Sequence, residues 1–305
     1  MRCPLCNADV VNVRSRIKAE DLIALWRNSQ VDVSDILKKD LDFVKCDKCK
    51  IEFYYPILSG DDGFYSKLAG WNWYYKHPGK SEYSYASSLI SSGDKVIDIG
   101  CGIGEFSKYI TEHADFTGIE LSSRAVEIAR SMGRNVIQTS VENAANDFGG
   151  VFDYVTCFQV LEHLTDLESF IPGCIDLCKK GGHIILAVPN NEGFLASDVN
   201  NIMNMPPHHT LMWNKDSLFF LAKKYDLRII DFHNEDLQDV HKVWAHRVKI
   251  NHAIRKLLGK RRKKVDRTFF SRFLYIASHV LALLSVRVWP SLVKEGHSAI
   301  ITLEK

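Results

Sequence analysis

Residues 96–106 read Val96-Ile-Asp-Ile-Gly-Cys-Gly-Ile-Gly-Glu-Phe106. The first four predict a short buried strand that carries one acid, Asp98. Glycines follow at alternate positions, Gly100, Gly102 and Gly104. Because they lack a Cβ atom, they allow the backbone to turn sharply and to approach a ligand closely. Apolar residues at helical spacing come next. Strand, glycine turn and helix in this order are typical of the nucleotide-binding corner of an open α/β sheet.

The spacing of the glycines narrows the class of ligand. A dinucleotide-binding fingerprint needs a third glycine where this chain has Glu105, and a phosphate-binding P-loop needs a Gly-Lys-Ser/Thr sequence that is absent. A second acid, Glu120, ends the next predicted strand, 116–121. Doubly wound folds place a carboxylate at about this position to bind ribose hydroxyls. The alternative is a generic α/β turn with chance glycines, which the second acid disfavours.

The rest of the chain continues the alternation of strands and helices. A later run, Val160-Leu-Glu-His-Leu164, follows the end of a strand, and Thr165 and Glu168 predict a capping box for the next helix. Asn214 is the predicted cap of a helix that ends near Lys224. The remaining elements are predicted as a helix over 123–132 and strands over 135–138, 152–157, 183–188, 228–232 and 298–303.

With Asp98, the three glycines, Glu120 and the Val-Leu-Glu-His-Leu run, the chain resembles the class I S-adenosylmethionine-dependent methyltransferases. Within that family it is similar to small-molecule enzymes of sugar and ubiquinone pathways, some of which carry an N-terminal zinc ribbon. The resemblance implies an α/β fold: a Rossmann-like seven-stranded sheet with an antiparallel last strand and helices on both faces. A small N-terminal zinc ribbon and a helical insert before the last strand complete the predicted architecture.

The resemblance also implies how S-adenosylmethionine is held. Asp98 and the glycine turn would bind its amino-acid part, partly through water, and Glu120 would bind the ribose hydroxyls. The family usually has Asp at the first adenine-contacting position, where this chain has Ser140. The expected cofactor-binding residues are Asp98, Gly100, Gly102, Gly104, Glu120, Ser140, Val141, Glu142, Phe158 and Gln159.

Three histidines are candidates for the group that accepts a proton from the methyl acceptor. His163 follows the fourth strand of the core, whereas His208 and His209 lie in the loop sequence Met205-Pro-Pro-His-His-Thr210. That loop leaves a strand at its carboxyl end, so it should overhang the cofactor pocket. An imidazole suits the role because its pKa lies near neutral pH. The alternative is that these histidines only hold the loop by hydrogen bonds to its backbone.

Aromatic residues are concentrated between residues 51 and 94, before the first core strand. The simplest interpretation is helical packing against the sheet, since aromatic side chains usually belong to the core. The alternative is that Tyr74, Tyr75 and Tyr83 line the cofactor or acceptor pocket.

Two C-x-x-C pairs, Cys3/Cys6 and Cys46/Cys49, stand near the N-terminus. Together they can present four thiolates to one tetrahedral Zn²⁺, and such a closed site is structural. The 39 residues between the pairs exceed the spacing of a compact ribbon, so we expect a helix around residues 22–26 within them. The alternative is two unrelated pairs, one of them redox-active.

Composition places the protein among ordinary soluble chains, with 305 residues, a net charge of +2 and 25% charged residues. Eight cysteines without a recognisable secretory signal indicate a reducing compartment. We therefore expect a cytoplasmic protein, in four parts: a zinc ribbon with a helical insert (1–66), a cofactor-binding core (67–250), a basic and apolar helical insert (251–296) and a last core strand (297–305).

The insert is the least ordinary segment. Residues 251–296 contain eleven Lys and Arg against two Asp and Glu, a net charge of +9, and 273–286 has no Asp, Glu, Lys or Arg. Written as a helix, 271–289 has a narrow stripe of small and polar residues and a broad apolar face. That face can be buried in the domain, covered by a second subunit in a homodimer, or laid in a membrane interface. In the last case segment 255–289 makes the peripheral contact, with the basic run 255–264 on anionic lipid.

The predicted function is methyl transfer from S-adenosylmethionine to a small-molecule or lipid-linked acceptor, such as a sugar or another secondary metabolite. An RNA-modifying enzyme is the first alternative, given the zinc knuckles and the basic insert. The Asn/Asp-Pro-Pro-aromatic motif common in base methyltransferases is absent, which disfavours base methylation but not ribose methylation. A nucleic-acid partner is not expected. The second alternative is an inactive assembly module, which the complete set of Asp98, glycines and Glu120 disfavours.

Overall fold

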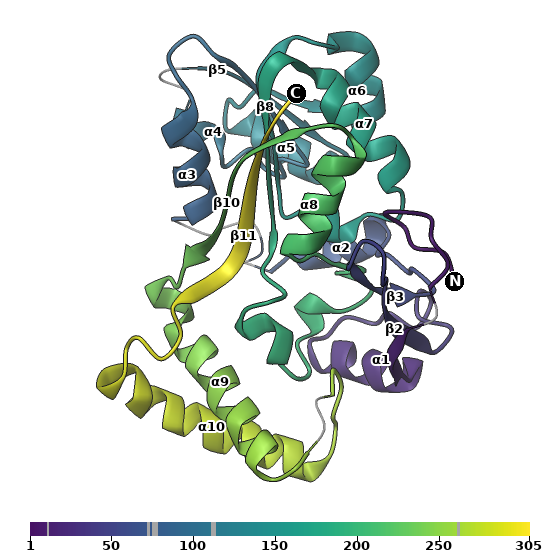
Figure 1. Cartoon of the computed structure of the whole chain (residues 1–305), viewed down its shortest axis with the longest axis vertical. Coiled ribbons are helices and arrows are strands. Elements are labelled where there is room, and N and C mark those ends of the chain that lie inside the picture. The colour runs from purple at the N-terminus through teal and green to yellow at the C-terminus, as the bar shows by residue number, and fades with distance from the viewer. Residues whose placement is uncertain (11, 72–73, 75–78, 111–113, 261–262) are drawn as a thin grey trace.

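The computed structural model describes the whole chain except residues 11, 72–73, 75–78, 111–113 and 261–262 (Figure 1). Tyr75, one of the expected pocket-lining tyrosines, therefore lies outside the described residues. So do Arg261 and Arg262 of the basic run.

A seven-stranded sheet forms the core, with the strand order β10-β11-β8-β7-β4-β5-β6. The five strands from β8 to β6 in this order are parallel, and β11 is antiparallel to both of its neighbours. The predicted sheet with an antiparallel last strand is thus confirmed. The strands are β4 (Lys95–Ile99), β5 (Asp115–Glu120), β6 (Val136–Gln138), β7 (Phe152–Phe158), β8 (Cys178–Pro189), β10 (Arg228–Asp236) and β11 (Glu295–Glu304).

Central strands are apolar on both faces because helices cover both sides of the sheet. In β4, Val96, Ile97 and Ile99 are all buried, and so is the acid between them, Asp98. The covering helices are α3 (Ser81–Leu89), α4 (Ser107–Ile110), α5 (Ser123–Ser131), α6 (Val141–Phe148), α7 (Leu167–Leu177) and α8 (Lys215–Lys224).

Two predicted helix N-caps, for α8 and for α7, can be compared with the structure. Asn214 caps α8 as predicted, in a reciprocal capping box with Ser217. The cap predicted for α7 was wrong by one residue: Asp166, not Thr165, accepts the backbone N–H groups of Glu168 and Ser169. A carboxylate one position later reaches the same orphan donors and also favours the positive end of the helix.

The N-terminal part forms a second sheet of four strands in the order β1-β2-β3-β9. Its first three strands are β1 (Val13–Ile17), β2 (Leu41–Lys45) and β3 (Glu52–Tyr55), with helices α1 (Ala19–Asn28) and α2 (Asp62–Ala69) beside them. The predicted helix around 22–26 is α1, which buries Leu22 and Trp26. The fourth strand, β9 (Leu211–Met212), comes from the long loop after β8 and pairs with β3. The overhanging loop is therefore tied to the N-terminal sheet.

The segment between β10 and β11 is a helical hairpin, which lies at the bottom of Figure 1. It consists of α9 (Lys242–Leu257) and α10 (Phe269–Val288). Helix α9 packs on the short helix η2 (Phe194–Ser197), which follows the carboxyl end of β8. The helical part of the insert thus begins at Lys242. The other short helices are η1 (Leu161–His163), η3 (Ile202–Asn204) and η4 (Asp239–His241).

Candidate functional site

The glycine turn follows β4 and is anchored to the neighbouring strand. The backbone N–H groups of Gly100 and Cys101 both donate to the carbonyl oxygen of Ile119 in β5, at 2.9 and 3.1 Å. Gly100 has a φ of +67°, and a Cβ atom there would lie 2.6 Å from a methyl carbon of Val160. This position therefore requires glycine for both conformation and space. The turn keeps the backbone N–H groups that follow β4 at the ligand-binding edge of the sheet.

Two acids flank the turn. Asp98 is buried, and its carboxylate accepts a hydrogen bond from the Thr156 hydroxyl at 2.9 Å. Burial raises the pKa of Asp98 to about 7 against the lowering effect of Thr156. Glu120 ends β5 and accepts three backbone N–H groups: Gly102 at 2.9 Å, and Leu121 and Ser122 at 2.8 Å each. Glu120 thus braces the turn while its carboxylate stands where a ribose is expected.

The other predicted cofactor-binding residues lie at the carboxyl ends of neighbouring strands. Ser140 follows β6 and caps α6 by accepting the Asn143 N–H, and Val141 behind it is buried. Glu142 accepts a hydrogen bond from the Ser169 hydroxyl at 3.2 Å. These contacts fix the start of α6 beside α7.

Phe158 is the last residue of β7, and Gln159 follows it. The Phe158 ring is buried against Tyr83 and Phe106, with centroid distances of 5.0 and 4.9 Å. Tyr83 is accordingly part of the core below the turn. Gln159 has a φ of +57°, which is strained for a residue with a side chain, and its amide donates to the Ser298 hydroxyl at 3.1 Å. Backbone strain of this kind is concentrated at functional sites.

The adjacent His208 and His209 meet His163, 45 residues earlier in the chain, in one cluster with ring centroids 4.4–4.8 Å apart. In each ring Nδ1 faces an oxygen: the His208 carbonyl for His163 (2.6 Å), the Met203 carbonyl for His208 (2.8 Å) and the Asn204 amide oxygen for His209 (3.1 Å). Carbonyl oxygens only accept hydrogen bonds, so Nδ1 carries the proton in every ring. Each Nε2 is left as a proton acceptor.

Burial keeps these rings neutral. It lowers the pKa of His163 to about 4, and it lowers the pKa values of His208 and His209 well below the ordinary value. The Nε2 atom of His208 faces the Tyr74 hydroxyl at 3.1 Å, and the Tyr65 hydroxyl lies 3.2 Å from Nδ1 of His163. The cluster is therefore a set of uncharged bases at physiological pH.

A buried acid adjoins the histidines. Oε1 of Glu162 lies 3.8 Å from Nε2 of His209 and 4.0 Å from Nε2 of His163. Within the described residues neither carboxylate oxygen has a hydrogen-bond partner, and burial raises the pKa of Glu162 to about 8. One nitrogen from each of the three imidazoles lies within 4.8 Å of the others, so these donors could hold a divalent cation as well as a proton.

The four N-terminal cysteines also come together. Sγ of Cys3 is 3.4 Å from Sγ of Cys49, Sγ of Cys6 is 3.5 Å from Sγ of Cys46, and all four sulfur atoms lie within 4.8 Å of one another. These separations are too long for disulfides and match the edges of a tetrahedron of thiolates around Zn²⁺. The Cys49 thiol lowers the pKa of Cys3 to about 5, which favours a thiolate there.

The backbone of the two C-x-x-C turns is equivalent. In each, the first cysteine's carbonyl accepts the N–H four residues later, and its own N–H donates to the carbonyl five residues later. The residue four positions on, Asn7 or Lys50, has a positive φ of 56° or 64°. Two matching knuckles facing each other are the arrangement that a four-thiolate metal site requires.

Sequence comparison assigns the core. The Methyltransferase domain family matches residues 74–231, just over half of the chain. This chain is a member of that family. The match includes both acids, the glycine turn and the histidine cluster of the methyltransferase core. It leaves the N-terminal cysteines and the hairpin outside.

Among curated relatives of this methyltransferase are ubiquinone biosynthesis O-methyltransferases. The protein from Pectobacterium carotovorum is 35% identical over 107 residues, which cover 33% of this chain and 45% of the relative. The protein from Erwinia tasmaniensis is 36% identical over 129 residues, covering 39% and 53%. The chain thus spans about half the length of these relatives.

Solved structures share the fold at low sequence identity. A SAM-dependent methyltransferase from Thermotoga maritima, described as a possible histamine N-methyltransferase, has a TM-score of 0.50 and 17% identity over 80% of this chain and 97% of that one. The phosphoethanolamine N-methyltransferase 2 of Haemonchus contortus, solved with S-adenosyl-L-methionine, has a TM-score of 0.50 and 16% identity over 80% and 57%. Both likenesses establish the class I methyltransferase fold.

Sequence reasoning missed two participants in the histidine cluster, Glu162 and Tyr65. Glu162 directly precedes His163, and its position in the Val-Leu-Glu-His-Leu run was the available signal. Tyr65 carries no such signal, because its contact with His163 depends on how α2 docks against the loop after β7. Tyr74 was a predicted pocket residue, and it lies at His208.

Proposed function

We propose that this chain transfers a methyl group from S-adenosylmethionine to a small-molecule or lipid-linked acceptor, such as a sugar or another secondary metabolite. The observation that carries the proposal is the placement of Asp98, the glycine turn and Glu120 at the carboxyl ends of two adjacent parallel strands, β4 and β5, where open α/β sheets bind their ligands. The names of the relatives support a small acceptor. Asp98, the glycine turn and Glu120 offer hydrogen-bonding groups that fit S-adenosylmethionine. The four N-terminal cysteines offer the thiolates that fit a structural Zn²⁺.

The bound cofactor supplies a methyl group that is already activated on a sulfonium centre. The protein's own tasks are therefore to hold, to orient and to accept a proton. Asp98 and the turn are proposed to bind the amino-acid part, Glu120 the ribose, and Ser140, Val141 and Glu142 the adenine. Phe158 and Gln159 are proposed to border the cofactor from β7. The four cysteines hold a structural Zn²⁺, which keeps the N-terminal sheet against the loop that carries His208 and His209.

The pKa of Asp98 leads to a pH test of cofactor binding. A carboxylate binds the ammonium group of the cofactor, whereas a protonated acid does not, so affinity should rise with pH through the pKa of the free enzyme. We expect the affinity for S-adenosylhomocysteine to increase up to about tenfold per pH unit below about pH 7 and to level off above it. Calorimetric titration at several pH values measures this dependence.

Asp98→Asn is the control for that titration. It keeps the shape of the side chain but cannot ionise, so its residual binding should not depend on pH. An affinity of the wild type that stays constant from acid to neutral pH would contradict the role of Asp98. Absence of any binding would contradict the proposed function itself.

The histidine cluster is the proposed proton acceptor. Nε2 of His163 and of His209 carry lone pairs and are held by their Nδ1 hydrogen bonds, while His208 accepts from Tyr74. Removing His209 as His209→Asn should lower kcat by roughly 10²–10⁴-fold and leave cofactor affinity nearly unchanged. Because a base acts in its neutral form and burial lowers the pKa of these rings, kcat of the wild type should stay flat down to about pH 5 and fall only below it.

Turnover is measured as S-adenosylhomocysteine release at saturating substrates, with the acceptor that an initial screen of sugars and phenols identifies. His183→Asn, at a partly exposed histidine that stacks on Tyr154 away from the cluster, is the matched control. If His209→Asn keeps full kcat, the cluster only holds the loop. A kcat that falls with a midpoint near pH 6.5 would assign the base to an ordinary, solvated histidine elsewhere.

A further inference from the structure

Helix α10 turns its apolar side outward. Six of its large apolar residues are 54–84% exposed: Phe269, Phe273, Ile276, Val280, Leu284 and Val288. The residues buried on this helix are small or polar apart from one leucine: Ser271, Leu274, Ser278, Ala282 and Ser285. A helix on the surface of a soluble domain normally buries its apolar stripe and exposes its polar one. Of the three arrangements that the sequence left open for this face, the structure excludes burial within the domain.

Polar pairs on α9 account for this orientation. His246 hydrogen-bonds Ser285 at 2.8 Å, Asn251 donates to Ser278 at 3.4 Å, and Arg255 donates to Ser271 at 2.6 Å. The three pairs run in antiparallel register along the two helices. The contact between the two helices therefore contains buried polar groups, and each of them makes a hydrogen bond to the other helix.

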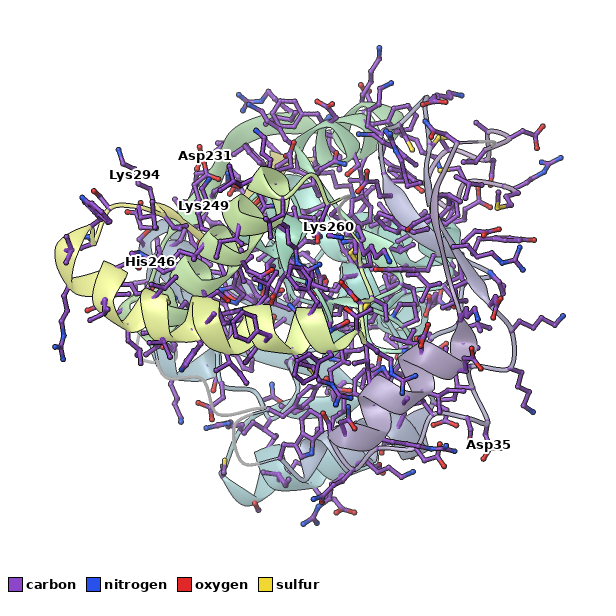
Figure 2. All side chains as sticks on the ribbon, turned by 90° about the horizontal axis from the view of Figure 1, so that it is seen from below. Asp35, Asp231, His246, Lys249, Lys260 and Lys294 are labelled. Atoms are coloured by element: carbon purple, nitrogen blue, oxygen red, sulfur yellow. The ribbon has the colours of Figure 1, made fainter. Side chains whose placement is uncertain are left out.

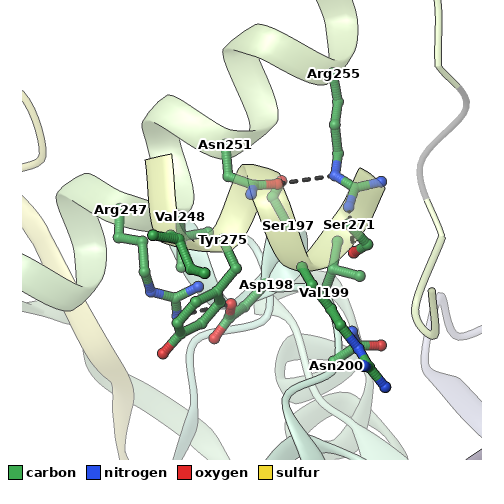
Figure 3. A pocket seen from close by; sticks show the side chains of 12 residues that line it. Ser197, Asp198, Val199, Asn200, Arg247, Val248, Asn251, Arg255, Ser271 and Tyr275 are labelled. Atoms are coloured by element: carbon green, nitrogen blue, oxygen red, sulfur yellow. Dashed lines mark hydrogen bonds and ion pairs between the residues drawn. The ribbon is translucent and has the colours of Figure 1, made fainter. Parts of the chain in front are cut away.

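Figure 3 shows part of this seam, around a cavity of about 260 Å³ between α9, α10 and residues 197–200. Arg255 is also bonded to Asn251 at 2.8 Å, and Arg247 to Asp198 at 3.1 Å. Rotating α10 to bury its apolar face would break its bonds to His246, Asn251 and Arg255 and leave these buried polar groups without partners on α10. The outward apolar face is consequently a stable feature of the fold.

Positive charge surrounds the exposed face. Between residues 242 and 294 the chain has fourteen Lys and Arg and a single acid, Asp266, which is buried in an ion pair with Arg255 at 2.8 Å. In the view from below, α10 lies in front of the molecule, with Lys249 and Lys260 on the helix hairpin and Lys294 following it (Figure 2). Lys260 also reaches over the Phe270 ring at 5.8 Å. Acids lie at the edges of this surface, since Asp21 of α1 pairs with Arg267 at 2.9 Å and the exposed Glu295 follows Lys294. The excess of basic residues beside the apolar strip makes it complementary to an anionic lipid surface.

We propose that the α9–α10 hairpin docks this protein on anionic membranes, with the outer face of α10 lying in the lipid interface. By length and composition alone α10 could cross a bilayer, and 28% of its most apolar stretch is buried. Its polar seam and the exposed Lys249 and Lys256 on α9 favour an orientation in the plane of the membrane, since a crossing would carry those lysines into hydrocarbon. Large exposed apolar patches typically mark surfaces that bind a membrane or another protein.

The position of the hairpin connects docking to the site. Helix α9 packs Ala245 and Val248 on Phe194 and Leu195 of η2, which directly follows the carboxyl end of β8. The parallel strands present the glycine turn at the same end of the sheet. A docked hairpin therefore brings the cofactor end of the core toward the lipid surface, where an acceptor with a lipid tail would be within reach.

Sedimentation with vesicles tests the proposal, using phosphatidylcholine with about one third phosphatidylglycerol and, in parallel, phosphatidylcholine alone. Wild type should sediment with the anionic vesicles, less so as salt rises and less with phosphatidylcholine alone. Ile276→Asp/Leu284→Asp places two acids on the exposed face and should reduce the partition coefficient by at least about tenfold. Met132→Asp/Val151→Asp makes the same charge change at exposed apolar residues away from the hairpin and should bind like wild type.

Both double variants change exposed side chains, and circular dichroism with urea unfolding verifies that they fold. A wild type that stays in the supernatant at low salt overturns the proposal, as does an α10 variant that binds vesicles as well as wild type. Sedimentation velocity without lipid tests the alternative that a second copy of the chain covers this face. That alternative would hold if the wild type forms a stable dimer, if the α10 variant abolishes it and if no vesicle binding is seen. None of these measurements uses the cofactor, so their outcome is independent of methyl transfer.

Discussion

If the four N-terminal cysteines hold the proposed zinc, the Cys46→Ser variant is expected to lose the metal and, with it, several kcal/mol of folding free energy. Cys46 is buried, and its sulfur lies 3.5 Å from that of Cys6 across the two knuckles. A hydroxyl cannot replace a thiolate in a closed four-ligand site, and the three remaining cysteines would be left without their common partner. Structural zinc contributes roughly 10–16 kcal/mol to the folding of zinc-finger peptides at neutral pH, so the loss should dominate the stability of this region.

The loss should spread beyond the ribbon. Cys3, Cys46 and Cys49 belong to the same buried apolar cluster as Leu211 of β9 and Trp213, which follows that strand. Since β9 pairs with β3, loosening the knuckles should also loosen the loop that carries His208 and His209. We therefore expect the variant to show a lower urea midpoint and impaired turnover, although its cofactor-binding strands are intact.

Elemental analysis of the purified protein provides the main readout, with one zinc per wild-type chain. The matched control is Cys178→Ala, which removes a buried thiol from β8 and should keep its metal. Equal zinc in wild type and Cys46→Ser would show that the four sulfur atoms are not the ligands. A second metal equivalent that disappears in His209→Asn would instead place a cation at the histidine cluster.

The second large effect is expected for Glu120→Ala, which should weaken binding of S-adenosylmethionine and S-adenosylhomocysteine by roughly 2–4 kcal/mol, or about 30- to 700-fold. The carboxylate is proposed to bind the ribose, and it already accepts the N–H groups of Gly102, Leu121 and Ser122. Alanine removes both interactions at once. The turn then loses its brace at the same time as the ribose loses its acceptor.

A cofactor analogue separates the two contributions. S-adenosylhomocysteine without the ribose 2′-hydroxyl should bind the wild type more weakly than the parent compound, but it should bind Glu120→Ala about as weakly as the parent does, because the partner of that hydroxyl is gone. Glu127→Ala, an exposed acid of α5 paired with Arg124, is the control. If calorimetry shows that a folded Glu120→Ala protein binds S-adenosylhomocysteine as tightly as wild type, Glu120 does not bind the ribose.

Much of the core follows from the sequence alone. The apolar run before Gly100, the alternating glycines and the acid at Glu120 predict the strand–turn–helix corner, because each is a local requirement of backbone conformation or burial. The seven-stranded sheet with its antiparallel last strand follows from the family resemblance and is confirmed. The two C-x-x-C pairs likewise predict that their four sulfur atoms lie close together. Thiolates that bind one ion must converge whatever the conformation of the chain between them.

Tertiary structure alone decided the histidine cluster. His163 comes from the end of β7 and His208 from the loop after β8, and Tyr65 and Tyr74 reach them from the N-terminal part. No periodicity links these positions, because their contact depends on how β9 docks on β3. Burial, which makes the rings neutral and raises the pKa of Glu162, is also a property of that packing rather than of any residue.

The orientation of α10 shows the same division. Its sequence distinguishes a small polar stripe from a broad apolar face, because both repeat with the period of a helix. Periodicity does not tell which face turns inward. The answer depends on what the neighbouring helix offers, and His246, Asn251 and Arg255 of α9 offer polar partners that only the stripe can satisfy. A buried polar group without a partner costs more free energy than an apolar group left exposed, so the stripe faces inward and the apolar face turns outward.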